Sequence, residues 1–116
     1  MTAVTHNFII EQGTTLSKVF VWKDSAGVPI NLTGYTARIQ SRPTARSATV
    51  YLDATTANGK IVIDAENGKV TLGLTSNETS ALDWISGVYD LELEDSSGTV
   101  TRLSQGSITI SQEVTR

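Results

Sequence analysis

The stretch VYDLELE, at residues 88–94, decides the fold class of this 116-residue chain. Apolar and acidic side chains alternate along it, with Tyr89, Leu91 and Leu93 on one face and Asp90, Glu92 and Glu94 on the other. Successive side chains of a β-strand point to opposite faces of the sheet. The period of two therefore indicates a strand with one buried face and one solvated face.

Short segments of the same character lie on both sides of this stretch and are separated by turn-forming residues. The β-branched residues Thr, Val and Ile supply 36 of the 116 residues, and such residues pack well on pleated sheets. About eight short strands at roughly ten-residue spacing predict an all-β protein, either a β-sandwich or a barrel, and a sandwich of mostly antiparallel strands fits better. The whole chain, 1–116, is then a single β-sandwich domain with short tails at 1–7 and 112–116.

Local motifs add two predictions to this outline. The pairs Asn58-Gly59 and Asn67-Gly68 separate β-rich segments and favour type I′ hairpin turns, in which both central residues have positive φ. The sequence TSNE at residues 75–78 matches a capping box, the start signal of a helix. We therefore expect two tight hairpins and one short helical turn near residues 76–82.

Charge and cysteine content exclude several functional classes. Nine Lys and Arg against twelve Asp and Glu give a net charge of −3, whereas a protein that binds nucleic acid phosphates needs a basic stripe. The sequence has no Cys, so neither a disulfide framework nor a thiolate metal site can form. It shows no signal peptide, and no apolar run approaches the roughly 20 residues of a membrane span. We expect a soluble protein with no nucleic acid and no membrane among its partners.

Groups that could carry out catalysis are scarce. The single histidine, His6, lies in the expected N-terminal tail, and no nucleophile elbow, phosphate loop or dinucleotide motif is present. The carboxylates Asp90, Glu92 and Glu94 follow one another along one strand at steps of about 7 Å. This spacing fits a solvated outer face better than converging metal ligands. We expect no enzymatic activity, no cofactor and no metal site.

The arginines Arg38, Arg42 and Arg46 form the basic cluster of the sequence, and the charge is unevenly distributed. Residues 1–58 carry a formal charge of +2 and residues 59–116 carry −5. One interpretation is ordinary solvated surface. The other is a basic surface and a separate acidic surface, through which subunits dock with complementary charge.

Aromatic residues outside the strand pattern are a further set of candidates. Trp84 lies in a connection shortly before Gly87, where it either plugs the end of the sandwich or anchors a partner. A carbohydrate platform built from Trp84 and Tyr35 is an alternative. The candidate partner-binding residues are therefore Arg38, Arg42, Arg46, Trp84, Asp90, Glu92 and Glu94.

Several segments, in their order along the chain, resemble small proteins of tailed bacteriophages that are akin to the N-terminal domain of the phage baseplate upper protein. The segments are IEQGTT (10–15), FVWKDSAGVPINLTGYTARI (20–39), LTSNETSAL (74–82), GVYDLEL (87–93), VTRL (100–103), Gly106 and VTR (114–116). The resemblance implies an immunoglobulin-like β-sandwich that serves as a structural part of a virion, without catalytic activity. It transfers no active-site residues.

From this resemblance we expect a virion structural protein, an adaptor in the tail, baseplate or fibre attachment, assembled in the host bacterial cytoplasm. Its expected partners are other phage structural proteins and further copies of itself as a homo-oligomer. Two alternatives remain at this point: a capsid decoration protein and a carbohydrate-binding module.

Overall fold

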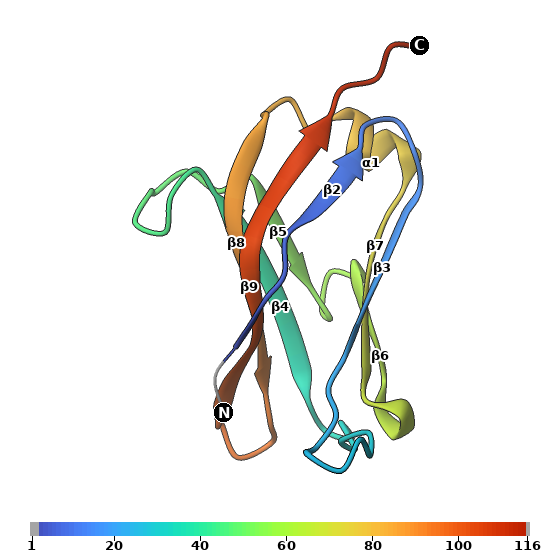
Figure 1. Ribbon diagram of the computed structural model, residues 1–116, viewed down its shortest axis with the longest axis vertical. Helices are drawn as coiled ribbons and strands as arrows, with labels where there is room; N and C mark the ends of the chain where they lie inside the picture. The colour runs from blue at the N-terminus through green and yellow to red at the C-terminus, as the bar shows by residue number, and fades with distance from the viewer. Residues whose placement is uncertain (1–2, 116) are drawn as a thin grey trace.

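The computed structural model describes residues 3–115, and nine β-strands in this part of the chain form two sheets that pack face to face (Figure 1). This confirms the predicted β-sandwich. The strands are β1 (Val4–Thr5), β2 (Phe8–Glu11), β3 (Leu16–Val21), β4 (Thr36–Arg42), β5 (Leu52–Thr55), β6 (Ile61–Asp64), β7 (Lys69–Leu74), β8 (Ser86–Glu94) and β9 (Val100–Ser111). The helical pieces are η1 (Ala65–Asn67) and α1 (Ser76–Ser80).

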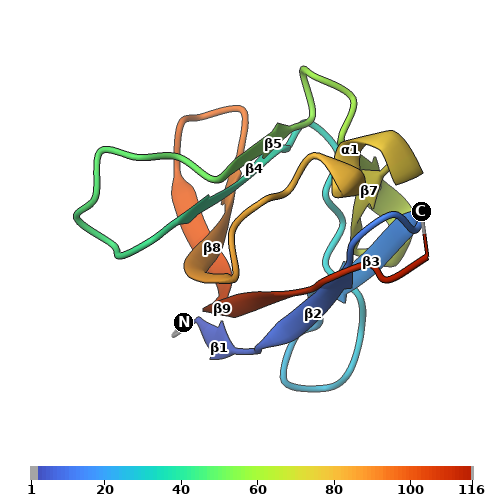
Figure 2. The ribbon, with the colours of Figure 1, turned by 90° about the horizontal axis from the view of Figure 1, so that it is seen from above.

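The two sheets differ in size. The large sheet has the order β1-β9-β8-β4-β5, with β2 also paired to β9, and the small sheet has the order β3-β7-β6. Neighbouring strands are antiparallel, except that β1 and β2 run parallel to β9. Seen from above, the small sheet faces the large one across the core, and α1 lies at the near end of β7 (Figure 2).

The core lies between the inner faces of the two sheets. Ile39 of β4 and Leu91 and Leu93 of β8 come from the large sheet, and Val70 and Leu72 of β7 come from the small sheet; all five are fully buried. In the strand predicted from residues 88–94, Tyr89, Leu91 and Leu93 therefore lie in the core, and Val88 and the carboxylates lie on the outer face.

The N-terminal segment corrects the prediction of a free tail at residues 1–7. Val4 and Thr5 form β1 and pair with Ser104 and Gln105 of β9, and the N–H of His6 donates to the Gln105 carbonyl oxygen at 2.8 Å. The hydroxyl of Tyr89 donates to the His6 carbonyl oxygen at 2.6 Å. The segment pairs because β9 would otherwise leave backbone groups without hydrogen bonds along its edge.

At the other end of the chain, in the predicted tail 112–116, the N–H of Glu113 donates to Oε1 of Gln12 at 3.0 Å. The remaining predicted tail positions 1, 2 and 116 lie outside the described residues.

The predicted type I′ turns are wrong. Within residues 3–115 every positive φ belongs to a glycine, so neither Asn58 nor Asn67 adopts the left-handed conformation that this turn requires. Instead, the Asn58 side chain accepts hydrogen bonds from the N–H groups of Thr55 and Lys60, both at 3.0 Å. Asn67 ends η1, and Gly68 takes the left-handed conformation after it.

The predicted capping box is present at the start of α1, which covers Ser76–Ser80 within the expected range 76–82. The Thr75 hydroxyl accepts from the Glu78 N–H at 3.1 Å, and the Glu78 carboxylate accepts from the Thr75 N–H at 2.9 Å. The hydrogen bond from Lys60 and then that from the Thr75 N–H lower the pKa of Glu78.

Candidate protein-interaction surface

The charged candidates from the sequence lie mainly on one surface, the outer face of the large sheet. Its central strands β4 and β8 are neighbours, and the sheet register places Arg38 opposite Glu92 and Gln40 opposite Asp90. On the other side of β8, Glu92 lies opposite Arg102 of β9. A row of alternating charge, Arg38, Glu92 and Arg102, therefore crosses three strands.

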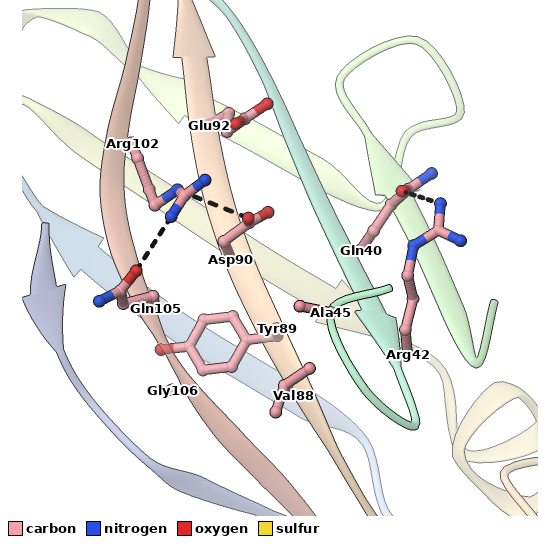
Figure 3. A pocket seen from close by; sticks show the side chains of 10 residues that line it. All are labelled: Gln40, Arg42, Ala45, Val88, Tyr89, Asp90, Glu92, Arg102, Gln105 and Gly106. Atoms are coloured by element: carbon pink, nitrogen blue, oxygen red, sulfur yellow. Dashed lines mark hydrogen bonds and ion pairs between the residues drawn. The ribbon is translucent and has the colours of Figure 1, made fainter. Parts of the chain in front are cut away.

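Ion pairs along this face are short and exposed to solvent. Nε of Arg38 lies 3.3 Å from a carboxylate oxygen of Asp53 on β5, and Nε of Arg102 lies 3.5 Å from a carboxylate oxygen of Asp90. Figure 3 shows Arg102 between Asp90 and Gln105, and a hydrogen bond of 3.2 Å joins Arg102 to the Gln105 side chain. Exposed pairs of this kind contribute about 0.2–1 kcal/mol each, so they add little to the stability of the fold.

The hypothesis of a basic surface separate from an acidic one is wrong, because the sheet register interleaves the two signs on one face. The sequence showed which residues alternate within a strand but not which strands are neighbours. For the same reason it did not identify Asp53 and Arg102, which contribute to this face from β5 and β9.

Arg42 and Arg46 differ in burial, since Arg42 is half-buried and Arg46 is exposed. Nη1 of Arg42 donates to the Ser47 carbonyl oxygen at 2.8 Å, and Nη2 donates to Oε1 of Gln40 at 2.9 Å. Arg42 thus ties the loop 43–50, which projects from the sandwich in Figure 1, to the end of β4. Arg46 lies exposed in that loop, and Glu94 lies exposed at the end of β8.

Two open grooves run over this face. One has a volume of about 400 Å³ and is lined by residues of β4, β8, β9 and the loop 43–50, among them Gln40, Arg42, Ala45, Asp90 and Arg102 (Figure 3). The other has a volume of about 390 Å³ and extends toward the ends of β4, β5 and β8, where Arg38 and Glu94 line it. Glu92 lines both grooves, so the charge row lies where they meet.

Near one end of the same face, five uncharged side chains lie between Arg42 and Glu11. Ile9 of β2, Thr109 of β9 and Ser86 of β8 lie side by side in the sheet register, and Val88 lies opposite Ser107 in the next outward row. Ile9 is 62% exposed and Val88 is 38% exposed. We call these five residues the uncharged end of the large sheet. Exposed apolar side chains beside fixed polar groups are the combination found in protein interfaces.

Trp84 is a plug at the end of the sandwich and not an exposed anchor. It is 8% exposed and stacks on Tyr51, with ring centroids 4.6 Å apart and planes inclined by 5°. Tyr35, the second residue of the proposed carbohydrate platform, packs edge to face on Trp22 at a centroid distance of 6.1 Å. Trp84 and Tyr35 therefore do not form the exposed aromatic platform that sugar stacking requires.

His6 is exposed, and its ring lies 6.1 Å from that of Phe8. No group of three or more His, Cys, Asp or Glu side chains within residues 3–115 is arranged to hold a metal ion. The helices among these residues include none that is long and apolar enough to cross a membrane.

Comparison with known proteins identifies the fold. No family model and no curated protein match the sequence. Among solved structures, a chicken TCR is similar with a TM-score of 0.57 and 15% identity, over 97% of this chain and 55% of that one. The N-terminal domain of phage TP901-1 ORF48 gives a TM-score of 0.49 and 14% identity, over 94% of this chain and 84% of that one. This chain thus spans about half the length of the TCR chain, and the fold is an immunoglobulin-like β-sandwich.

Proposed function

We propose that the protein is a non-catalytic structural protein of a tailed-bacteriophage particle, an adaptor in the tail, baseplate or fibre attachment that is assembled in the host cytoplasm. Two features support the proposal: the segments that resemble phage baseplate proteins, which extend from residue 10 to the C-terminus, and the immunoglobulin-like sandwich that those segments build. Its partners in the proposal are other virion proteins and further copies of the chain.

The observation that carries the proposal is the outer face of the large sheet. Its charges occupy fixed positions in register across β4, β8 and β9, and the uncharged end beside them leaves Ile9 and Val88 exposed. In protein interfaces apolar contacts of this kind supply affinity, while fixed charges determine orientation and exclude wrong partners. A broad open face of this composition suits a protein partner better than a small ligand.

Purified phage particles test the assignment directly. Particles of the phage that encodes the chain are separated into tails and capsids on a density gradient, and the protein is quantified by mass spectrometry in each fraction. We expect a fixed copy number in the tail fraction. Recovery in the capsid fraction alone would identify a decoration protein, and absence from both fractions would contradict the proposal.

A matched pair of variants tests the surface. Val88→Asp places a carboxylate at the uncharged end, next to Arg42 in the sheet register, so the fold should be retained. Val28→Asp introduces the same charge at a residue that is 55% exposed in the turn between β3 and β4. We expect Val88→Asp particles to lack the protein and Val28→Asp particles to contain it at the normal level. Equal incorporation of both variants would show that this face is not the contact.

A further inference from the structure

The strand edges of the sandwich differ in how well they are protected against pairing with another chain. A free edge presents unpaired N–H and C=O groups and pairs readily with another strand unless the sequence prevents it. The edges are formed by β5 and by β1 and β2 in the large sheet, and by β3 and β6 in the small sheet (Figure 1).

The edge of β5 is covered by a side chain. The Thr56 N–H donates to the Ala37 carbonyl oxygen of β4, so by alternation the backbone groups of Asp53 and Thr55 point away from the sheet. The Asn58 side chain bonds to the backbone of both residues. Its Oδ1 accepts from the Thr55 N–H and its Nδ2 donates to the Asp53 carbonyl oxygen, each at 3.0 Å. A further strand cannot pair there without displacing Asn58.

The edges of β3 and β2 carry other protection. Lys18 points to the inner face at the edge of β3, and its ammonium lies 5.4 Å from the centre of the Phe8 ring. Inward-pointing charged residues prevent edge strands from pairing with other chains. At the end of β2, the Glu11 carbonyl oxygen already accepts from both the N–H and the hydroxyl of Thr14, at 3.2 and 2.7 Å.

The edge of β6 has no such protection. The Gly73 N–H of β7 donates to the Lys60 carbonyl oxygen at 2.8 Å, so Lys60, Val62 and Asp64 turn their backbone groups toward β7. The backbone groups of Ile61 and Ile63 therefore point out of the sheet, and within residues 3–115 they have no hydrogen-bond partner. The strand is free of proline, and the side chain of Val62, on the outer face, is 64% exposed.

We propose that β6 pairs antiparallel with β6 of a second copy of this chain about a two-fold axis at Val62, which joins the two small sheets into one six-stranded sheet. In this register Ile61 lies opposite Ile63 of the second copy, so the outward N–H and C=O groups of both copies are all paired. Val62 lies opposite Val62. Lys60 lies opposite Asp64, and because the axis is two-fold this pair of opposite charges occurs twice.

The charges of Lys60 and Asp64 favour a second copy of β6 as the partner strand, and they also favour this register over others. A shift by two residues in either direction keeps the hydrogen bonds in phase but removes the opposition of Lys60 and Asp64. Both charged groups retain capacity for a second contact: the Lys60 ammonium already lies 2.8 Å from the Glu78 carboxylate but has three donors, and Asp64 accepts from Asn67 through one oxygen. The strand is thus complementary to itself.

The contact is small, and this predicts a weak dimer in solution. Two four-residue strands bury less surface than the roughly 1,200–2,000 Å² of a stable interface. We therefore infer weak association of the isolated chains, which becomes effective in a particle where neighbouring copies are held together. The inference rests on the proposed structural function, but its test uses the isolated protein, so the two can fail separately.

Cysteine crosslinking provides the test. The sequence has no Cys, so Val62→Cys introduces a single thiol, and opposed residues of a non-hydrogen-bonded pair lie close enough for a disulfide. The matched control is Val19→Cys, on the outer face of the same sheet but on β3. At about 100 µM under mild oxidation, we expect Val62→Cys to form covalent dimers at least about tenfold faster than the control, because pairing raises the effective concentration of the two thiols. Equal rates for the two variants would overturn the proposal.

Charge reversal tests the register. Lys60→Asp should slow the crosslinking of Val62→Cys, and the double change Lys60→Asp with Asp64→Lys should restore it, because opposite charges again face each other. Failure of the double change to restore the rate would overturn the register. Hydrogen exchange of the Ile61 and Ile63 amides should slow as wild-type concentration rises; slowing only when another virion protein is added would overturn the choice of a second copy as partner.

Discussion

The hydroxyl of Tyr89 joins three segments of the fold, and its removal gives the sharpest test of how the N-terminal strand is held. It donates to the His6 carbonyl oxygen at 2.6 Å and lies 2.9 Å from the Ser104 hydroxyl, which is buried. Since its one proton is used toward His6, the Ser104 hydroxyl is the donor in the second bond. Tyr89→Phe keeps the ring, which packs edge to face on Phe8 at 5.1 Å, and removes both hydrogen bonds.

The expected cost follows from the groups left without partners. A buried donor or acceptor that loses its partner costs about 1–3 kcal/mol. Ser104 is buried whereas His6 is an exposed residue, so we expect a loss of about 2 kcal/mol and a decrease in Tm of roughly 5–10 °C for a domain of this size. Urea unfolding followed by tryptophan fluorescence measures the loss in free energy of unfolding, and hydrogen exchange of residues 4–9 shows whether β1 opens.

Two controls separate the hydrogen bonds from other effects. Tyr35→Phe removes a hydroxyl that bonds to no other group within the described residues, and it should change stability by less than about 0.5 kcal/mol. Tyr89→Phe combined with Ser104→Ala should cost less than the sum of the single changes, because the orphaned hydroxyl is gone. If Tyr89→Phe unfolds at the wild-type urea concentration and the amides of β1 exchange at the wild-type rate, the Tyr89 hydroxyl does not hold the N-terminal strand.

Further predictions concern pH, a glycine and a helix cap. Burial raises the pKa of the Tyr89 phenol, so its contribution to stability is full below the unfolded-state pKa of about 10 and is lost as pH rises through the folded-state value; alkaline titration should destabilise the wild type more than Tyr89→Phe. Gly68→Ala should cost more than about 2 kcal/mol in urea unfolding and Gly59→Ala about 1 kcal/mol, because both have positive φ but only at Gly68 would a Cβ overlap backbone atoms. Equal costs for Gly68→Ala and Gly59→Ala would show that overlap of the added Cβ with the backbone is not the cause. Thr75→Ala should cost about 1 kcal/mol through loss of the cap. The hydrogen bond from Lys60 is the main cause of the lowered pKa of Glu78. The contribution of Glu78 to stability is therefore present above its unfolded-state pKa and is lost as pH falls through its folded-state pKa. Glu78→Gln should flatten the acid limb of the plot of stability against pH, and an unchanged limb would contradict this role of Glu78.

The strand at residues 88–94 shows how much a local pattern can predict. Its period of two assigned Leu91 and Leu93 to the core and Asp90 and Glu92 to an outer face, and the structure has them there. The period does not say which strands flank it. The pairing of Glu92 with Arg38 on one side and Arg102 on the other depends on sheet order and register, and neither can be read from one strand.

The N-terminal segment shows the opposite case. A two-residue strand has too little periodicity to be recognised, and Val4 and Thr5 were predicted as tail. Their pairing depends on β9, about 100 residues away, and on a hydroxyl of β8 that reaches the His6 carbonyl group. Trp84 is similar: its environment is set by Tyr51, which approaches it only when β5 and β8 have joined the same sheet.

The all-β class, the buried and solvated sides of the clearest strand and the capping box of α1 could be predicted from the sequence, because each depends on residues a few positions apart. Which charges face each other, where the N-terminal strand pairs and which sheet edge stays open became known from the folded structure alone. These features depend on contacts between distant segments, whose register is fixed by packing of the whole core and is not encoded in any single stretch.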